Sequence, residues 1–148
     1  MKLYSIAKGT KRNIEDVNDD AFSQKMMGDG VAIIPEEGEV FAPESGEITM
    51  LFPTLHAIGL KLNSGVEVLI HIGIDTVEME GNGFVSHIHQ GTQVKKGELL
   101  ISFNIEEIEK RGYESDIMVI ITNTSEYQNI KSTEATKLQV GDVLLEIE

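Results

Sequence analysis

The chain has 148 residues but no cysteine and no tryptophan, and aromatic residues make up only 5% of it. The missing cysteine excludes disulfide bonds, thiolate metal sites and a thiol nucleophile within this sequence. Hydrophobic residues still reach 41%, which is enough for a core built mainly from Val, Ile and Leu. A sequence of this length predicts a single domain over residues 1–148.

Long apolar segments and positive charge are also scarce. No apolar run approaches the ~18 residues of a membrane-spanning helix, and Lys8 follows the short segment from Met1 to Ile6 too soon for a secretory signal. We therefore expect a soluble, cytoplasmic protein that does not insert into a membrane. The formal net charge is −13. This charge disfavours nucleic acid and anionic membranes as partners, and it suits either a basic protein partner or plain solubility.

Glycine recurs every few residues, and the segments between the glycines are rich in β-branched residues. Many short strands separated by turn signals predict an all-β fold, an antiparallel β-sandwich or barrel. One or two short helical turns are expected, at residues 19–25 and 104–112. Residues 1–16 are polar, and we expect them to be loosely ordered. The main expected strands are residues 31–34, 47–51, 58–62, 66–74, 99–103, 118–122 and 143–147.

One histidine lies in the middle of a strongly apolar predicted strand. Val and Ile alternate at every second position from residue 66 to residue 74, so they share one face of the strand. His71 and Gly73 lie on the other face. Because Gly73 has no side chain to cover its neighbour, we expect a shallow opening beside a ring nitrogen of His71.

A second histidine, His56, precedes the neighbouring predicted strand, and Asn63, Ser64 and Gly65 form a turn between the two strands. We predict an even loop, with the hairpin axis between residues 63 and 64. In that register His56 and His71 are direct cross-strand neighbours, with Cβ atoms about 4.5–5.5 Å apart. Thr54 shares the face of His56 if that segment is extended.

Two close imidazoles beside a hydroxyl allow two chemistries. A neutral ring nitrogen can attack a phosphoryl group, or the two rings can bind a metal such as Zn²⁺, with Asp75 as the candidate third ligand. A third interpretation is that each ring simply fills a partly buried strand position. His87 and His89 have the H-x-H spacing of a metal site, but flanking glycines favour solvated loop residues.

Residues 65–77 resemble, at each defined position, the signature of the glucose-type IIA domain of the bacterial phosphoenolpyruvate-dependent sugar phosphotransferase system. The resemblance covers about residue 17 to the C-terminus and leaves residues 1–16 as a divergent segment. The sequence differs from the family pattern at residues 4–16, at Leu55 and at Ile117-Met118, where Thr-Pro is frequent. Further matching segments are residues 27–35, 41–46, 54–59, 80–84 and 94–97.

The resemblance implies a β-sandwich phosphocarrier that accepts a phosphoryl group, originally from phosphoenolpyruvate, from phospho-HPr and passes it to a cysteine of a IIB domain. It implies that His71 is the phosphorylated nucleophile, that His56 stabilises and transfers the phosphoryl group, and that Thr54 supplies a supporting hydroxyl. The residues expected to contact partner proteins are Asp19, Phe22, Phe52, Gly73, Asp75 and Glu78.

No cofactor is required by this resemblance, although His56 and His71 can bind zinc at a partner interface. Since the sequence has no cysteine, the IIB acceptor is expected on a separate chain. One alternative function is regulatory: the phosphorylation state would control which partner proteins bind. A lipoyl- or biotin-type carrier is a second alternative, but Lys25-Met26-Met27 lacks the usual arrangement of an acceptor lysine between methionines.

Overall fold

The computed structural model describes residues 1–148. Its strands are antiparallel, as the glycine-punctuated sequence predicts. Two short α-helices are present, α1 (Asp20–Ser23) and α2 (Ile105–Lys110), together with 3-10 turns at Ile14–Asp16, Thr76–Met79 and Thr124–Glu126. The strands are β1 (Lys2–Tyr4), β2 (Gly9–Asn13), β3 (Asp29–Pro35), β4 (Glu39–Phe41), β5 (Gly46–Leu51), β6 (Ala57–Leu62), β7 (Glu67–Ile72), β8 (Phe84–Ser86), β9 (Gln93–Val94), β10 (Leu99–Phe103), β11 (Ile117–Ile121), β12 (Ile130–Ser132), β13 (Lys137–Leu138) and β14 (Val143–Ile147).

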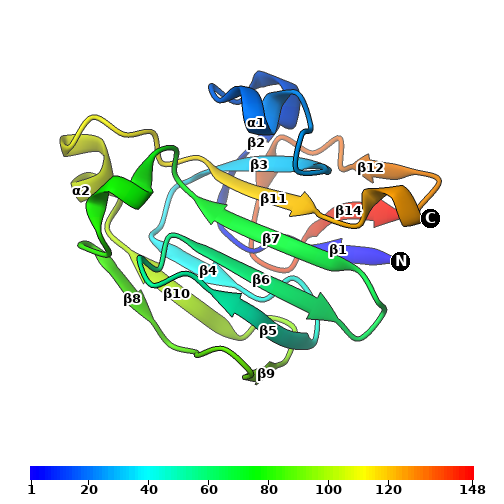
Figure 1. The fold of residues 1–148 in the computed structure, drawn as a ribbon. Helices are drawn as coiled ribbons and strands as arrows, with labels where there is room; N and C mark the ends of the chain where they lie inside the picture. The colour runs from blue at the N-terminus through cyan, green and yellow to red at the C-terminus, as the bar shows by residue number, and fades with distance from the viewer.

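Three sheets enclose one main core. The largest has eight strands in the order β13-β2-β3-β11-β7-β6-β5-β9, and the two smaller sheets are β4-β10-β8 and β1-β14-β12. Figure 1 shows β11, β7, β6 and β5 as consecutive ribbons of the large sheet, with β8 and β10 beside α2. Buried Val, Ile and Leu side chains from all three sheets meet in one cluster. The predicted all-β sandwich is therefore confirmed.

The alternation predicted for the His71 strand is present in β7, but Ile74, predicted on the same face, lies beyond the strand and belongs to the apolar cluster on the opposite face. Val68, Ile70 and Ile72 point into the main core and are at most 2% exposed, and burying each contributes about 1.5–3 kcal/mol. On the opposite face of the sheet, a smaller apolar cluster forms where α1 covers part of the surface. Its members are Ile14, Val17, Phe22, Ala32, Ile74, Met118 and Ile120. His71 lies at the margin of this second cluster, next to Phe22.

The N-terminal segment is ordered, so the expectation of loose order over residues 1–16 is wrong. β1 pairs with β14, and β2 pairs with β3 over five residues. Leu3, Ile6 and Ile14 are at most 2% exposed. Because their side chains join the apolar clusters and the backbone joins two sheets, the segment is fixed despite its many polar residues.

Both predicted helical turns are present and are capped by side chains. Asp19 accepts a hydrogen bond from the Ala21 N–H at the start of α1, and Asn104 accepts one from the Glu107 N–H at the start of α2. Gly112, which follows α2, has a φ of 86° that suits glycine. None of the helices has both the length and the apolar character needed to cross a membrane.

Candidate functional site

The hairpin that joins β6 and β7 differs from the predicted one. His71 lies opposite Ala57, and Ile70 lies opposite Ile58, so the pairing is centred on Ser64 and the loop is odd. Gly65 adopts a φ of 96° at the last loop position, a conformation typical of three-residue hairpin loops that end in glycine. The predicted even register, with His56 directly opposite His71, is therefore wrong.

His56 nevertheless lies beside His71, because it belongs to the bend between β5 and β6 rather than to the strand. Leu55 has a φ of 60°, which turns the backbone just before His56. The backbone of His56 stays attached to β7, since its carbonyl accepts a hydrogen bond from the Ile72 N–H at 2.7 Å. The two imidazole rings lie edge to face with centroids 4.9 Å apart. The expected closeness of the two rings is thus confirmed.

The backbone after β7 fixes which nitrogen of His71 carries the proton. Nδ1 of His71 lies 2.8 Å from the carbonyl oxygen of Gly73. A carbonyl only accepts hydrogen bonds, so Nδ1 must be the donor and Nε2 of the neutral ring keeps a free lone pair. Gly73 has a φ of 78°, and a Cβ there would lie 3.0 Å from the Glu114 carbonyl oxygen. The turn that supplies this acceptor therefore requires glycine.

Thr54 contacts His56 rather than His71. Its Oγ1 lies 2.6 Å from Nδ1 of His56. When the hydroxyl donates to Nδ1, the proton of the neutral His56 ring resides on Nε2, which becomes a hydrogen-bond donor. The pair then has complementary chemistry: His71 offers a lone pair at Nε2, and His56 offers an N–H. Phe52 packs edge to face against His56 with centroids 5.4 Å apart.

Both histidines are held neutral. Burial, and then the neighbouring His71, lower the pKa of His56 from 6.5 to about 4. Burial also lowers the pKa of His71, although the bond to Gly73 and the carboxylates of Asp19 and Asp75 oppose that shift. At neutral pH neither ring is protonated to a cation. A neutral ring is the form that can act as a nucleophile.

The lowered pKa of His56 predicts that the folded protein loses stability in acid. The unfolded chain protonates His56 near pH 6.5, and the folded chain does so only near pH 4. The unfolded state therefore gains protons first, so stability is full above pH 6.5 and falls by up to about 3 kcal/mol towards pH 4. In urea unfolding measured between pH 7 and pH 4, the free energy of unfolding should fall less steeply for His56→Gln than for the parent chain. His87→Gln, a matched change at an exposed histidine, should follow the parent chain.

The residues expected to contact partners divide into exposed and buried groups. Phe52 is 39% exposed, and Asp75 and Glu78 are also exposed. In contrast, Phe22 is only 3% exposed and its ring centroid lies 5.0 Å from that of His71. Gly73 is buried too. Phe22 and Gly73 therefore contact His71 from within the protein. Their burial does not fit the expectation that they form a partner-binding surface.

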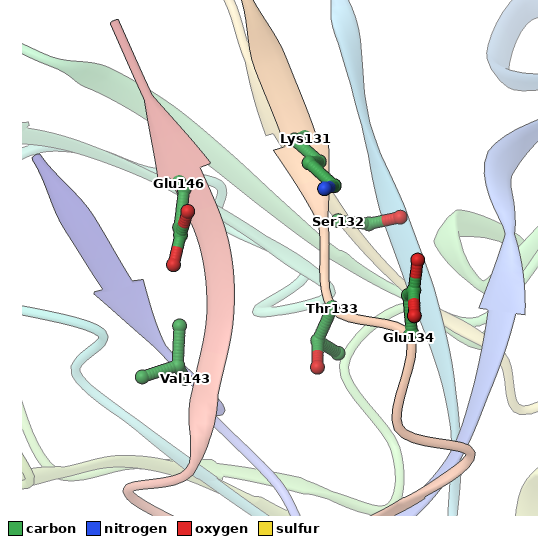
Figure 2. A pocket seen from close by; sticks show the side chains of 6 residues that line it. All are labelled: Lys131, Ser132, Thr133, Glu134, Val143 and Glu146. Carbon is green, nitrogen blue, oxygen red and sulfur yellow. The ribbon is translucent and has the colours of Figure 1, made fainter.

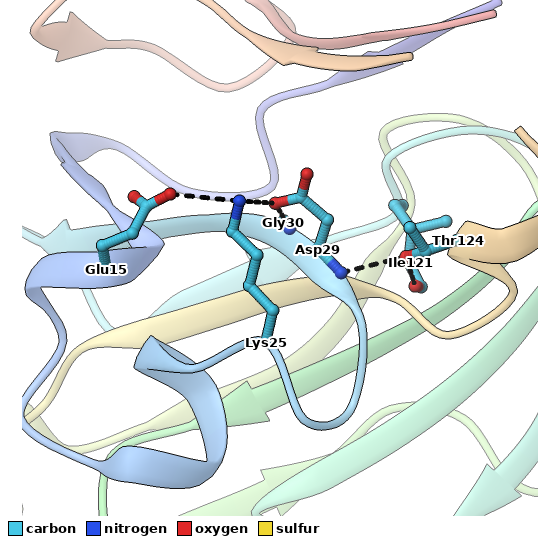
Figure 3. A network of polar contacts seen from close by, with 6 residues as sticks. All are labelled: Glu15, Lys25, Asp29, Gly30, Ile121 and Thr124. Atoms are coloured by element: carbon cyan, nitrogen blue, oxygen red, sulfur yellow. Dashed lines mark hydrogen bonds and ion pairs between the residues drawn. The ribbon is translucent and has the colours of Figure 1, made fainter. Parts of the chain in front are cut away.

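A polar network anchors the chain next to α1. Figure 3 shows Lys25 between two carboxylates, with Nζ 3.1 Å from Glu15 and 3.4 Å from Asp29. A backbone hydrogen bond and Lys25 lower the pKa of the Glu15 carboxyl. The Asp29 N–H donates to the Thr124 hydroxyl at 2.9 Å. The network connects Lys25, which follows α1, to Asp29, the first residue of β3. Asp19, which is half-buried, caps the start of α1. The network lies next to the helix whose Phe22 packs against His71.

No enclosed cavity surrounds the histidine pair, although His56 is only 4% exposed and His71 is half-buried. Five cavities are present, and none is lined by His56 or His71. One of about 310 Å³, between β12 and β14, contains mainly polar side chains such as Lys131, Thr133 and Glu146 (Figure 2). A histidine pair that no cavity encloses suits a group that is exchanged between proteins better than a small substrate that must be enclosed.

The acidic and histidine side chains do not gather into a cluster of three. No group of three or more His, Cys, Asp or Glu side chains lies close enough to hold a metal ion. Asp75 therefore does not complete a site with the two rings. The other two histidines, His87 and His89, are exposed, as the flanking glycines predict. Nε2 of His87 lies 2.8 Å from the Ser102 hydroxyl.

Comparison with known proteins identifies the family. Residues 1–127 match the family model described as "phosphoenolpyruvate-dependent sugar phosphotransferase system, EIIA 1". The chain belongs to this EIIA family. The match includes residues 1–16, which the resemblance seen in the sequence had left out. The ordered β1 and β2 strands are thus part of the region that the family model covers.

Similar proteins differ greatly in length. The chain is 42% identical to a glucose-specific EIIA component of Halalkalibacterium halodurans, over 97% of this chain and 83% of that protein. It is 45% identical to a beta-glucoside-specific EIIBCA component of the same organism, over 99% of this chain but only 23% of that protein. The structure of glucose permease IIA from Mycoplasma capricolum superposes with a TM-score of 0.92 at 34% identity, covering 98% of this chain and 94% of that one.

Proposed function

We propose that this EIIA chain is a phosphocarrier that accepts a phosphoryl group from phospho-HPr at Nε2 of His71 and passes it to a cysteine of a IIB domain. The hydrogen bond from Nδ1 of His71 to Gly73 carries this proposal, because it leaves Nε2 unprotonated and facing away from the turn. The ring of His56, whose centroid lies 4.9 Å from that of His71, supports the proposal as a donor for the phosphoryl oxygens. The partly exposed position of His71 leaves access for a partner protein.

The acceptance step needs no proton transfer. As the lone pair of Nε2 forms a bond to phosphorus, the bond from phosphorus to the donor histidine breaks and its electrons return to that ring. The His71 ring becomes an N-phosphoryl imidazolium that keeps its Nδ1–H bond to Gly73. The carboxylates of Asp19 and Asp75, which oppose the lowering of the His71 pKa, also favour this developing positive charge.

The onward step reverses the chemistry at His71. A cysteine thiolate of the IIB domain attacks phosphorus, the N–P bond breaks, and His71 returns to its neutral form. The acceptor cysteine lies outside these 148 residues, which contain none. The N–H of His56 faces the phosphoryl oxygens in both steps and offsets their charge. Thr54 acts through His56, since its hydroxyl holds the other ring nitrogen.

Exposed residues around the pair provide the docking surface. Phe52 offers apolar area, and Asp75 and Glu78 offer negative charge. Together with the net charge of −13, these carboxylates would steer a basic donor such as HPr to the site. Because the donor and acceptor proteins of this system act in the cytoplasm, we place the chain there. No cofactor is needed, and zinc would bind to His56 and His71 only with a further ligand from a partner.

The decisive test is a transfer assay with the purified chain. Incubation with phosphoenolpyruvate, enzyme I and HPr should add one acid-labile phosphoryl group, measured by intact mass, and a panel of IIB domains should then remove it. Failure to take up the group would overturn the proposal. Uptake without transfer to any IIB domain would instead support the regulatory alternative, in which phosphorylation controls partner binding.

A further inference from the structure

A row of paired residues crosses the large sheet from Arg12 in β2 to His71 in β7. Arg12 lies opposite Ala32, Ala32 opposite Met118, and Met118 opposite His71. Adjacent strands are about 4.8 Å apart, so Arg12 lies roughly 14 Å from His71 at the level of the backbone. Arg12 and His71 therefore share one face of the sheet without direct contact.

Arg12 forms the most buried ion pair of the protein. Its Nη1 lies 2.8 Å from Oδ2 of Asp116, whose side chain is 6% exposed. The carboxylates of the other ion pairs are 25% exposed or more. A carboxylate removed from water in this way depends on its partner, and loss of the partner leaves an uncompensated buried charge. The position of Asp116 is thus tied to Arg12.

The backbone around Asp116 holds the turn that binds His71. The Asp116 carbonyl accepts the Gly73 N–H at 2.7 Å, and the Glu114 carbonyl accepts the Ile74 N–H at 3.0 Å. These bonds lie on both sides of the Gly73 carbonyl, whose oxygen accepts the Nδ1–H of His71. A continuous set of contacts therefore leads from the Arg12 guanidinium through Asp116 and Gly73 to the His71 ring.

We propose that Arg12 and Asp116 are positioning residues for phosphoryl transfer, because their ion pair holds the turn whose Gly73 carbonyl keeps the proton of His71 on Nδ1. The proposal rests on the phosphocarrier function given above. Without Arg12, the Asp116 carboxylate must move towards water. A cavity of about 460 Å³ is lined by Arg12 together with Lys11 and Asp16, so the guanidinium lies beside water-accessible space. The turn would then shift, and part of the His71 population would carry its proton on Nε2, where it blocks attack.

Arg12→Met tests this proposal with two measurements. Imidazole ¹⁵N NMR of the unphosphorylated chain should show a new Nε2–H form of His71, and phosphoryl uptake from phospho-HPr should be roughly tenfold slower. Arg12→Lys should restore uptake to within about threefold, because a single Nη1 contact can be replaced by an ammonium. Lys137→Met, which removes an exposed lysine from the same edge of the sheet without touching Asp116, should change neither measurement.

A folded Arg12→Met chain in which either measurement matches the parent overturns the proposal. If that variant does not fold, the double variant Arg12→Leu/Asp116→Leu replaces it, since apolar pairs often restore the stability lost with a buried charge. Parental behaviour in the double variant would overturn the proposal, and slowed uptake with a mixed tautomer would support it. A parent chain that is never phosphorylated would refute the phosphocarrier function, whereas the NMR measurement would still test the positioning role.

Discussion

The His71→Ala variant is expected to take up no phosphoryl group from phospho-HPr, whereas the parent chain gains one. In the proposed function the lone pair on Nε2 of His71 is the nucleophile. The neighbouring His56 would not replace it when its Nδ1 accepts a hydrogen bond from Thr54, and the chain has no cysteine. Intact mass spectrometry after incubation with phosphoenolpyruvate, enzyme I and HPr measures the effect directly.

His87→Ala is the matched control for this loss. It removes an exposed imidazole whose one side-chain hydrogen bond is to Ser102, so its uptake should equal that of the parent chain. Circular dichroism would establish that both variants are folded. Full labelling of His71→Ala would mean that another residue is the phosphoryl acceptor, and the assignment of His71 would be wrong.

His56→Ala should separate the two halves of the transfer. The variant should still take up a phosphoryl group, because the attacking His71 ring is neutral and is not repelled by the negative phosphoryl oxygens. Onward transfer should fall by about 10² to 10³, the usual effect of losing one hydrogen-bond donor to a developing negative charge. In the proposed onward step a thiolate of the IIB domain approaches the negative phosphoryl group, so an N–H of His56 would contribute most there. Rapid-quench measurement of transfer to a IIB domain tests this.

Thr54→Val provides a milder version of the same change. It keeps the shape of the side chain but removes the hydroxyl 2.6 Å from Nδ1 of His56. The His56 proton is then free to occupy either nitrogen, so onward transfer should slow less than in His56→Ala. Transfer at the parental rate in His56→Ala would contradict the role given to that ring, and a normal rate in Thr54→Val alone would contradict only the role of the hydroxyl.

The sequence was sufficient to predict the fold class and the alternation of β7. The two histidines are close as predicted, but the even register from which their closeness was argued is wrong. The sequence did not determine the register of the hairpin, because Asn63, Ser64 and Gly65 suit both even and odd loops. The actual loop depends on the φ of Gly65, and the approach of the two rings depends on the bend at Leu55. Both are backbone choices that the packing of the whole sheet imposes.

Contacts between parts of the chain that are far apart in the sequence could not be predicted from local patterns. Arg12 and Asp116 are 104 positions apart, and neither lies in a pattern that marks a site. The strand β2 that carries Arg12 is short and rich in polar residues, so its sequence alone resembles a loop. Its structure follows from pairing with β3, which brings a charged side chain to the same face as His71.

The single reactive nitrogen of the proposed site has a consequence for how the phosphorylated state would be controlled. No cavity encloses His56 or His71. In the proposed function donor and acceptor proteins would both have to reach Nε2 of His71, so they could not be bound at the same time. Exchange with each partner is then a competition for one surface. The fraction of chains that carry a phosphoryl group would follow the ratio of charged donor to empty acceptor, and the protein would report the supply of phosphoryl groups relative to demand.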